Sequence, residues 1–434
     1  MSLKILSIEI SLFIILYGYA LAKYTRCWSH PAVIYAVFWF FMTMAPLVFV
    51  QSVPITPWAL IFILGTTVAF GLPAFCYDWS QSVAIARSRR ISVLTYNRLL
   101  PIFFGLQLCA IVFVGINLLI QGFSFSQIIV DPINSANHYM SLRYSGKVSS
   151  NIFMQGGIIF NYVAAALAGL TIERQKSRWM IVAIVFFAVT PSLMHMAFYA
   201  DKGTLFLAAS YFYGGVLVDR IMRGDTSLLN KVTAKAGLTA AIVLFPIIIF
   251  AMVSRQGEYS LSYVLNSYAF GHLYAFSDWF GGFYDVAPTL NAYSKPADST
   301  WGYWTFMGIG KQVYPAYLLP PGYWAEYLKT GEIQTNIYTF YRGLIYDYGL
   351  IGALAFMIIM GTISSVAYNA MLRRTTPSIS QAYFIFLMGF IYTSYIISLL
   401  IWNSAYIVFF IVALLLMANN AIREWRLLHL APRA

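Results

Sequence analysis

The chain has 434 residues, of which 60% are hydrophobic, 18% aromatic and only 10% charged, and its mean hydropathy is +0.71. A soluble domain carries about 25% charged residues, so this composition excludes a soluble protein and also the disordered, collagenous and disulfide-rich classes. The three cysteines, Cys27, Cys76 and Cys109, form no C-x-x-C pair and indicate neither a disulfide framework nor a zinc site. We therefore expect an all-α polytopic membrane protein, with residues 1–434 in one membrane domain.

Eleven apolar segments are long enough to cross a membrane, because a spanning helix needs about 20 apolar residues. In chain order they are 4–22, 32–53, 57–76, 99–121, 152–172, 179–199, 203–219, 237–253, 343–368, 382–400 and 404–421. The first segment has no small-residue cleavage site and leads directly into basic residues, so we expect a retained span rather than a signal peptide. Glu9 lies near its outer end, where a long polar side chain reaches water.

Basic residues divide the connections between spans into two groups. One group holds 18 of the 27 Lys and Arg residues: Lys23, Arg26, Arg87, Arg89, Arg90, Arg98, Arg174, Lys176, Arg178, Arg220, Arg223, Lys231, Lys235, Arg373, Arg374, Arg423, Arg426 and Arg433. Excess positive charge marks cytoplasmic loops, so we expect these connections and the C-terminus in the cytoplasm and the N-terminus in the periplasm. The net charge of +12 then reflects topology, and we expect no nucleic-acid partner.

Two periplasmic connections are long, 122–151 and 254–342, and the larger one has an unusual composition. Residues 254–338 contain 21 aromatic residues in 85 positions. A disordered loop is poor in aromatic residues and rich in charge, so we expect this one to fold or to lie at the membrane interface, which Tyr and Trp favour. Function is expected there.

Within the larger loop, residues 262–285 predict a helix that ends at the Gly281–Gly282 pair and carries His272, Phe276 and Trp279 on one stripe. Residues 313–329 contain three prolines and predict a turn followed by a short interfacial helix. The aromatic residues of that short helix are Tyr323, Trp324 and Tyr327.

The sequence contains no motif for metal, nucleotide or acyl-serine chemistry: H-E-x-x-H, D-x-D, a Walker loop and G-x-S-x-G are all absent. We therefore expect no metal and no cofactor. The other nine basic residues fall on the periplasmic side, against the topological bias, and four of them stand at the outer ends of spans or in the shorter loop: Arg143, Lys202, Arg255 and Arg342. Each alone is equally explained as an anchor at lipid headgroups, whereas a cluster of them would form an anion site, since guanidinium groups bind phosphate bidentately.

An outward anion site beside an aromatic-rich loop fits one substrate class, a lipid-linked diphosphate sugar. Such a donor is already activated, and arginines can neutralise the departing diphosphate in place of a metal ion. The transfer also needs a proton acceptor, because the hydroxyl group of the acceptor sugar loses its proton when it attacks the donor.

Three segments, TNIYTFYRGLIYDYGLIG at 335–352, ADKGTLFLA at 200–208 and VSRQGEYSLSYVLNSYAF at 253–270, follow a recognisable pattern. They resemble the oligosaccharide repeat unit polymerases, the Wzy-type O-antigen polymerases, in which the first segment follows the large periplasmic loop. The match departs from the family at Lys202, where members more often carry arginine, and a lysine lacks the guanidinium fork.

The resemblance implies a metal-independent, multi-span glycosyltransferase of the bacterial inner membrane whose cavity opens to the periplasm. It would join undecaprenyl-diphosphate-linked repeat units of O-antigen or a related surface polysaccharide in contact with membrane lipid, beside a flippase and a chain-length regulator. By position in the motifs, Arg255, Arg342 and Lys202 would surround the diphosphate, with Arg143 as a further candidate. The candidates for sugar contacts or neighbours of the diphosphate are Tyr338, Tyr346, Trp279 and Tyr259.

Three residues are candidates for the proton acceptor: Glu258, Asp278 and His272. Glu258 ranks first because it lies one helical turn from Arg255, although pairing with arginine makes a carboxylate a poorer base. Asp278 and His272 are equally explained as hydrogen-bonding sugar contacts.

Three other functions remain open. An O-antigen ligase uses the same donor with lipid A core as acceptor, and only the 335–352 segment favours the polymerase. A transporter or flippase for lipid-linked oligosaccharide predicts charged residues deep within several spans, whereas His195 is almost alone at depth and fits a packing role. A structural membrane protein gives no reason for the outward arginines.

Overall fold

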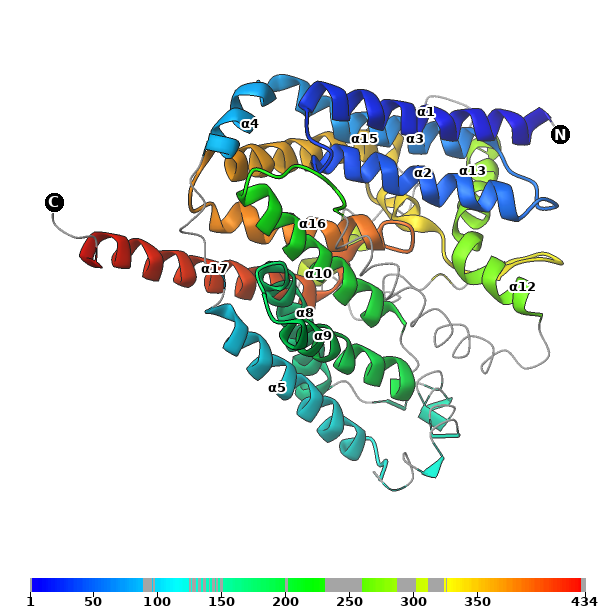
Figure 1. The fold of residues 1–434 in the computed structure, drawn as a ribbon. Helices are drawn as coiled ribbons and strands as arrows, with labels where there is room; N and C mark the ends of the chain where they lie inside the picture. The colour runs from blue at the N-terminus through cyan, green and yellow to red at the C-terminus, as the bar shows by residue number, and fades with distance from the viewer. Residues whose placement is uncertain are drawn as a thin grey trace.

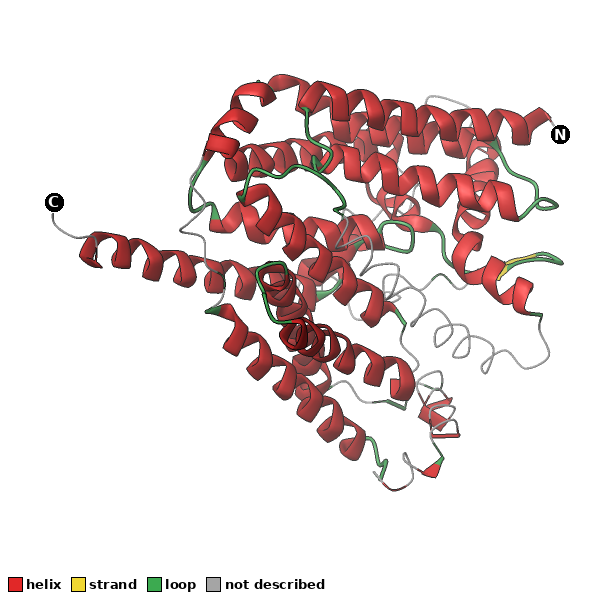
Figure 2. Ribbon diagram, viewed as in Figure 1, coloured by secondary structure: helices red, strands yellow, loops and turns green. Residues whose placement is uncertain are grey.

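The computed structural model describes residues 2–88, 98–124, 151–199, 202–230, 260–286, 302–310 and 326–430, together with Tyr96, Trp324 and scattered positions between 126 and 148. These residues form an elongated bundle of helices, and the only strands described make one short hairpin (Figures 1 and 2). The expectation of an all-α polytopic membrane protein is confirmed at this level.

Within the described chain, nine helices are long and apolar enough to cross a membrane. They are α1 (Ser2–Thr25), α2 (Pro31–Phe49), α3 (Pro57–Gly71) with its 3₁₀ extension (Leu72–Cys76), α5 (Leu99–Ile120), α8 (Ile152–Ile172), α9 (Arg178–Tyr199), α10 (Gly203–Met222), α15 (Thr339–Arg373) and α17 (Asn403–Leu430). A tenth apolar helix, α16 (Ser378–Thr393), is shorter. The predicted span 237–253 lies outside the described residues, so the total of eleven stays a prediction.

Two of the predicted spans have different limits in the structure. The span expected at 382–400 is not continuous, because α16 ends at Thr393 and a 3₁₀ turn, Leu399–Ile401, follows. The chain leaves the helix there because the carbonyl of Ser394 accepts a hydrogen bond from the backbone N–H of Phe340, 3.0 Å away. The span expected at 343–368 is part of the longer α15, which is interrupted at Gly349 with φ +68°, a conformation that glycine adopts without strain.

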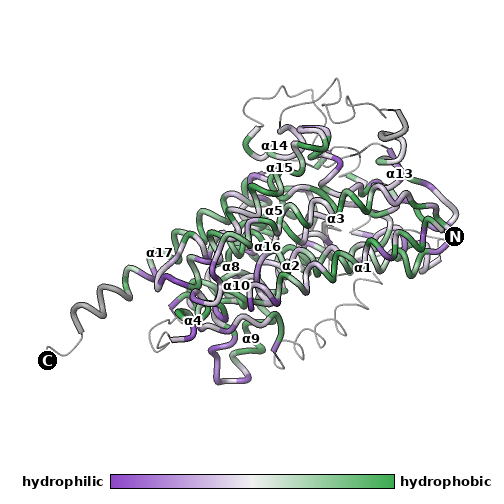
Figure 3. The backbone as a smooth tube through the Cα atoms, turned by 90° about the horizontal axis from the view of Figure 1, so that it is seen from above, coloured by the Kyte–Doolittle hydropathy of each residue, from purple (hydrophilic) through white to green (hydrophobic). Residues whose placement is uncertain are grey.

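One end of the bundle gathers several of the basic connections, including the one that contains α4 (Trp79–Ser88). The backbone N–H of Ser29 donates to the carbonyl of Thr226 at 2.9 Å, and Arg373 donates to the side chain of Gln81. Hydrophobic residues run along the helices, and hydrophilic ones collect at turns such as those beside α4 and α9 (Figure 3). Charge thus concentrates where a bundle in a membrane meets water.

A buried ion network ties α8 to α10 at this end. Arg174 pairs with Asp219 at 2.5 Å, and Arg223 pairs with both Asp219 (2.8 Å) and Glu173 (2.5 Å). Nε of the fully buried Arg220 donates to Glu173 at 2.9 Å. Burial by itself raises the pKa of Glu173, but the bonds to Arg220 and Arg223 outweigh it and hold that pKa below its usual range. Removing one member would leave an unpaired buried charge.

The opposite end carries the folded parts of the 254–342 connection. These are α12 (Leu261–Leu265), a π-helical turn (Asn266–Phe270), α13 (Gly271–Val286), α14 (Tyr303–Gly310) and the strands β1 (Leu328–Lys329) and β2 (Gln334–Thr335). The strands are antiparallel, with Leu328 opposite Thr335. The N-terminus lies at this end too, where Lys4 and Tyr274 both donate to the carbonyl of Val50, each at 2.6 Å.

Two local predictions in this connection were wrong. The helix does not end at Gly281–Gly282 but runs on to Val286. Phe280 packs on Phe62 of α3, with ring centroids 5.5 Å apart, and Gly281 itself lies beside Thr56 at the start of α3. The short interfacial helix is not found at the described positions Trp324 and Tyr327, which belong to no helix or strand and precede the hairpin.

Candidate functional site

The guanidinium of Arg342 is buried among aromatic rings at the loop-bearing end of the bundle. Arg342 lies in the first turns of α15 and is 1% exposed. Its Cζ atom is 3.9 Å from the ring centre of Trp324, 4.2 Å from that of Tyr338, 5.3 Å from that of Trp279 and 5.8 Å from that of Tyr346. Rings at these distances attract a cation, and the attraction is stronger where water is excluded.

These rings come from separate elements, and we call them, with Trp304, the arginine cage. Tyr346 lies four residues after Arg342 on the same side of α15, and Tyr338 is the N-cap residue directly before that helix. Trp279 comes from α13, and Trp324 from the chain before β1. Trp304 of α14 completes the group by stacking on Trp324, with ring centres 4.3 Å apart and planes 17° from parallel.

Asp347 fixes Trp304 in the cage. Its buried carboxylate accepts hydrogen bonds from the backbone N–H of Trp304 (3.2 Å), the backbone N–H of Thr305 (2.7 Å) and the hydroxyl of Thr305 (2.6 Å). These N–H groups belong to the start of α14, so Asp347 caps that helix from α15. The same residue therefore positions an aromatic ring and places α14 on α15.

The backbone just before Arg342 is strained. Thr339 has φ +64°, a left-handed conformation that β-branched residues rarely adopt. It is held there by the bond from the N–H of Phe340 to the carbonyl of Ser394. Strain of this kind persists only where the surrounding structure enforces it, and it concentrates at functional sites.

The charge of Arg342 is only partly compensated. Its Nη2 pairs with the carboxylate of Glu326 at 2.5 Å, and the side chain of Glu326 is 68% exposed. Nε and Nη1 of Arg342 are buried and have no hydrogen-bond partner among the residues that the structure describes. Guanidinium groups donate only, so the site retains donors suited to an anion.

A second carboxylate lies near this site. Burial raises the pKa of Tyr338, the Arg342 guanidinium opposes that shift, and the carboxylates of Glu326 and Asp278 add to it. Asp278 is exposed on α13, directly before Trp279. The structure therefore brings five of the predicted site residues into one neighbourhood: Arg342, Tyr338, Tyr346, Trp279 and Asp278.

Lys202 and His272 are placed elsewhere. The ammonium of Lys202 lies over the ring of Tyr268, 4.3 Å from its centre. Tyr268 belongs to the π-helical turn and is not one of the rings of the arginine cage. Nε2–H of His272 donates to the carbonyl of Met42 in α2 at 3.0 Å, and burial lowers the pKa of His272 to about 4. His272 is thus a neutral contact between α13 and α2.

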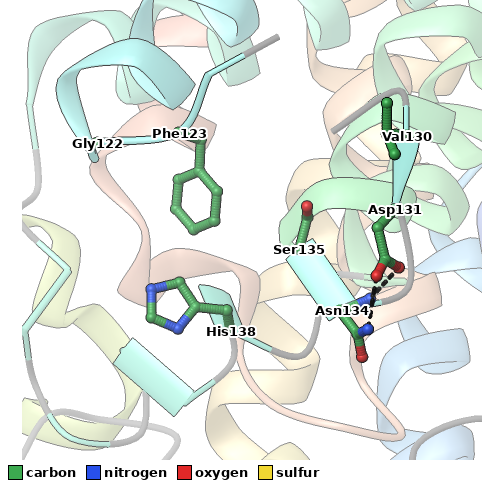
Figure 4. A pocket seen from close by; sticks show the side chains of 7 residues that line it. All are labelled: Gly122, Phe123, Val130, Asp131, Asn134, Ser135 and His138. Carbon is green, nitrogen blue, oxygen red and sulfur yellow. Dashed lines mark hydrogen bonds between the residues drawn. The ribbon is translucent and has the colours of Figure 1, made fainter. Parts of the chain in front are cut away.

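Four other predicted site residues, Arg143, Arg255, Glu258 and Tyr259, lie outside the described residues. Within the smaller loop the structure has one open hollow of about 430 Å³, lined by Gly122, Phe123, Val130, Asp131, Asn134, Ser135 and His138 (Figure 4). There Asp131 accepts a 2.6 Å bond from the side-chain amide of Asn134. This hollow contains none of the residues of the arginine cage.

The sequence did not single out Trp304, Glu326 or Asp347 as site residues, and it placed Trp324 in an interfacial helix. Only Asp347 lies in the motif around Arg342 and had a local signal. Trp304, Glu326 and Trp324 come from other segments, and their spacing along the chain does not predict that they meet Arg342. Over the described part of the chain, no three His, Cys, Asp or Glu side chains are grouped to hold a metal ion. Comparisons of the chain with protein-family models, with curated proteins and with solved structures find no match.

Proposed function

We propose that the chain is a glycosyltransferase that polymerises undecaprenyl-diphosphate-linked oligosaccharide repeat units, for O-antigen or a related surface polysaccharide, at the periplasmic face of the bacterial inner membrane. The observation that carries the proposal is the buried Arg342, whose Nε and Nη1 have no partner among the described residues, in an aromatic cage at the end of a membrane-spanning helix. The resemblance of residues 335–352 to the polymerase signature supports it independently.

The chemistry follows from this arrangement. When a sugar leaves undecaprenyl diphosphate, negative charge grows on the diphosphate, and a fixed guanidinium in a poorly hydrated site stabilises that charge. The rings of Trp279, Trp324 and Tyr346 provide broad apolar faces beside the guanidinium, which suit the apolar faces of sugar rings. The growing glycan would pass to the non-reducing end of a second lipid-linked repeat unit, with release of undecaprenyl diphosphate.

The test is reconstitution of the purified chain in liposomes. The substrate is the lipid-linked repeat unit extracted from cells that lack this chain, and the product is a polymer ladder. Arg342→Ala should abolish the ladder, and Arg342→Lys should slow it by roughly 10- to 100-fold, because lysine keeps the charge but loses the fork. Arg373→Ala is the matched control, since Arg373 is an exposed arginine of the same helix at its other end.

A ladder made by Arg342→Ala at the wild-type rate would remove Arg342 from the mechanism. If the wild-type chain makes no polymer but transfers glycan to added lipid A core, it is a ligase. If it transfers glycan to neither acceptor, the proposal fails.

A further inference from the structure

The ion pair at the arginine cage joins two side chains of very different accessibility. Arg342 is 1% exposed and enclosed by rings, whereas Glu326 is 68% exposed and lies just before the β1–β2 hairpin. A buried guanidinium requires a counter-charge. Glu326 supplies it from the solvent side, through Nη2 alone.

An exposed carboxylate on a buried cation can be displaced by a stronger anion. The diphosphate of the proposed donor carries more charge and more acceptor oxygens than one carboxylate, and it can bind Nε and Nη1 as well as Nη2. Arg342 is held by its aromatic neighbours, so Glu326 is the partner that moves. It would then lie free beside the bound diphosphate.

The other described acidic groups near the cage are less suited to take up a proton. Asp347 is buried and accepts three hydrogen bonds at the start of α14. Asp278 is exposed and acts on Tyr338, without an ion pair to Arg342 within the described structure. Glu326 alone among them combines contact with the guanidinium and access to solvent.

We propose that Glu326 is the proton acceptor of the transfer reaction, held by Arg342 at rest and freed when the donor's diphosphate replaces it. This rests on the proposed function. The acceptor hydroxyl oxygen forms a bond to the anomeric carbon of the donor, and its proton passes to the Glu326 carboxylate. The bond from the anomeric carbon to the diphosphate oxygen breaks, and undecaprenyl diphosphate leaves with the electron pair, paired to Arg342.

Two measurements on the full chain in nanodiscs separate the two parts of the proposal: affinity for undecaprenyl diphosphate, and the single-turnover rate with lipid-linked repeat unit. Glu326→Gln should bind undecaprenyl diphosphate about 3- to 10-fold more tightly, because the competing carboxylate is gone. Its turnover should fall at least 100-fold, the usual range for loss of a general base. Glu326→Asp, which keeps the carboxylate, should recover part of the rate.

The matched control is Glu332→Gln, which changes a glutamate of the neighbouring hairpin that acts on Lys4 and makes no ion pair with Arg342 in the described structure. Both of its measurements should equal those of the wild type. Turnover of Glu326→Gln within threefold of wild type overturns the proposal, and a loss confined to Asp278→Asn would assign the base to Asp278. If a folded Glu326→Gln variant binds undecaprenyl diphosphate more weakly than the wild type does, the diphosphate does not replace Glu326 on Arg342, and that part of the proposal is overturned.

If Glu326→Gln does not fold, Glu326→Asp is the test. A Glu326→Asp variant with the same affinity for undecaprenyl diphosphate and the same turnover rate as the wild type would overturn the proposal. The two failures are distinguishable. A wild-type chain that makes no glycosidic bond refutes the proposed function, whereas an active wild type with an equally active Glu326→Gln refutes only the role of Glu326.

Discussion

At the scale of single residues, the molecule stabilises buried cations and imidazoles in two ways. Arg342 is surrounded by aromatic faces and one carboxylate, so its charge remains while its hydration is removed. His272 is instead buried in its neutral form, with its Nε2–H bonded to a carbonyl of α2. The first arrangement keeps a charge available for a substrate, and the second provides a helix contact whose strength depends on pH.

The burial of His272 predicts a pH-dependent stability. Its pKa is lowered from 6.5 to about 4 in the folded chain, so between these values the unfolded chain binds a proton that the folded chain does not. Stability from this residue is complete above pH 6.5 and is lost as the pH falls towards 4, by up to about 3 kcal/mol. The melting midpoint in detergent should fall over that range.

The control for this prediction is His272→Gln, which keeps a donor for the carbonyl of Met42 but does not titrate. It should reduce the slope by the share of His272 and leave the dependence due to His30, whose burial lowers its pKa further, to about 3, so that a comparable slope remains over this range. An unchanged slope in the variant would show that His272 does not titrate on unfolding.

At the scale of elements, the site depends on how α14 and α15 are joined. Residues 303–310 make a helix of little more than two turns, which has small stability of its own. Asp347 of α15 caps it, and the hydroxyl of Ser398 donates to the carbonyl of Thr305 at 3.0 Å. α14 is therefore a folded segment because of its neighbours, and Trp304 reaches Trp324 only through that docking.

Replacing Asp347 should loosen this junction. Asp347→Ala removes three hydrogen bonds, and the two donors of Thr305 are buried, where an unsatisfied group costs about 1–3 kcal/mol. We expect a lower melting midpoint and faster proteolysis within α14. Asp225→Ala is the control, because the exposed Asp225 accepts similar local bonds, from Ser227, at the other end of the bundle. Equal protease sensitivity of the two variants would argue against the cap.

At the scale of the whole molecule, the bundle has two chemically distinct ends. At one end, an ion network links the basic connection after α8 to the end of α10. Its members are Glu173, Arg174, Asp219, Arg220 and Arg223. The other end carries the hairpin, α13, α14 and the arginine cage. Between the ends, α8 and α10 approach so closely that a Cβ on Gly169 would lie 1.9 Å from the carbonyl oxygen of Phe212, as in small-residue contacts between membrane helices.

The two ends should face opposite sides of the membrane. In a chain whose three native cysteines are replaced, a membrane-impermeant maleimide added to spheroplasts should label Lys329→Cys in the hairpin but not Arg373→Cys at the basic end. Both positions should react after the membrane is opened. Labelling of Arg373→Cys alone would invert the orientation, and labelling of both before opening would contradict the two-ended bundle.

The sequence by itself determined the class of this protein and the positions of most of its helices. Hydropathy and charge act locally along the chain, so a run of about 20 apolar residues becomes a membrane helix almost whatever its neighbours are. That is why all but one of the predicted spans correspond to described apolar helices, the remaining one being outside the described residues. The motif around Arg342 likewise predicted that Tyr346 neighbours Arg342, because the two residues lie one turn apart on α15.

Only the tertiary structure decided what surrounds that arginine and where weakly determined segments end. Trp279, Trp304, Trp324 and Glu326 come from segments that are distant in sequence, and no periodicity records which of them will meet. Glycine disfavours helix by about 1 kcal/mol, yet packing on α3 carried α13 through Gly281 and Gly282. Conversely, contacts with the start of α15 ended α16 at Thr393 within an apolar run. Packing between distant segments outweighs local preference at these places because it buries several side chains at once.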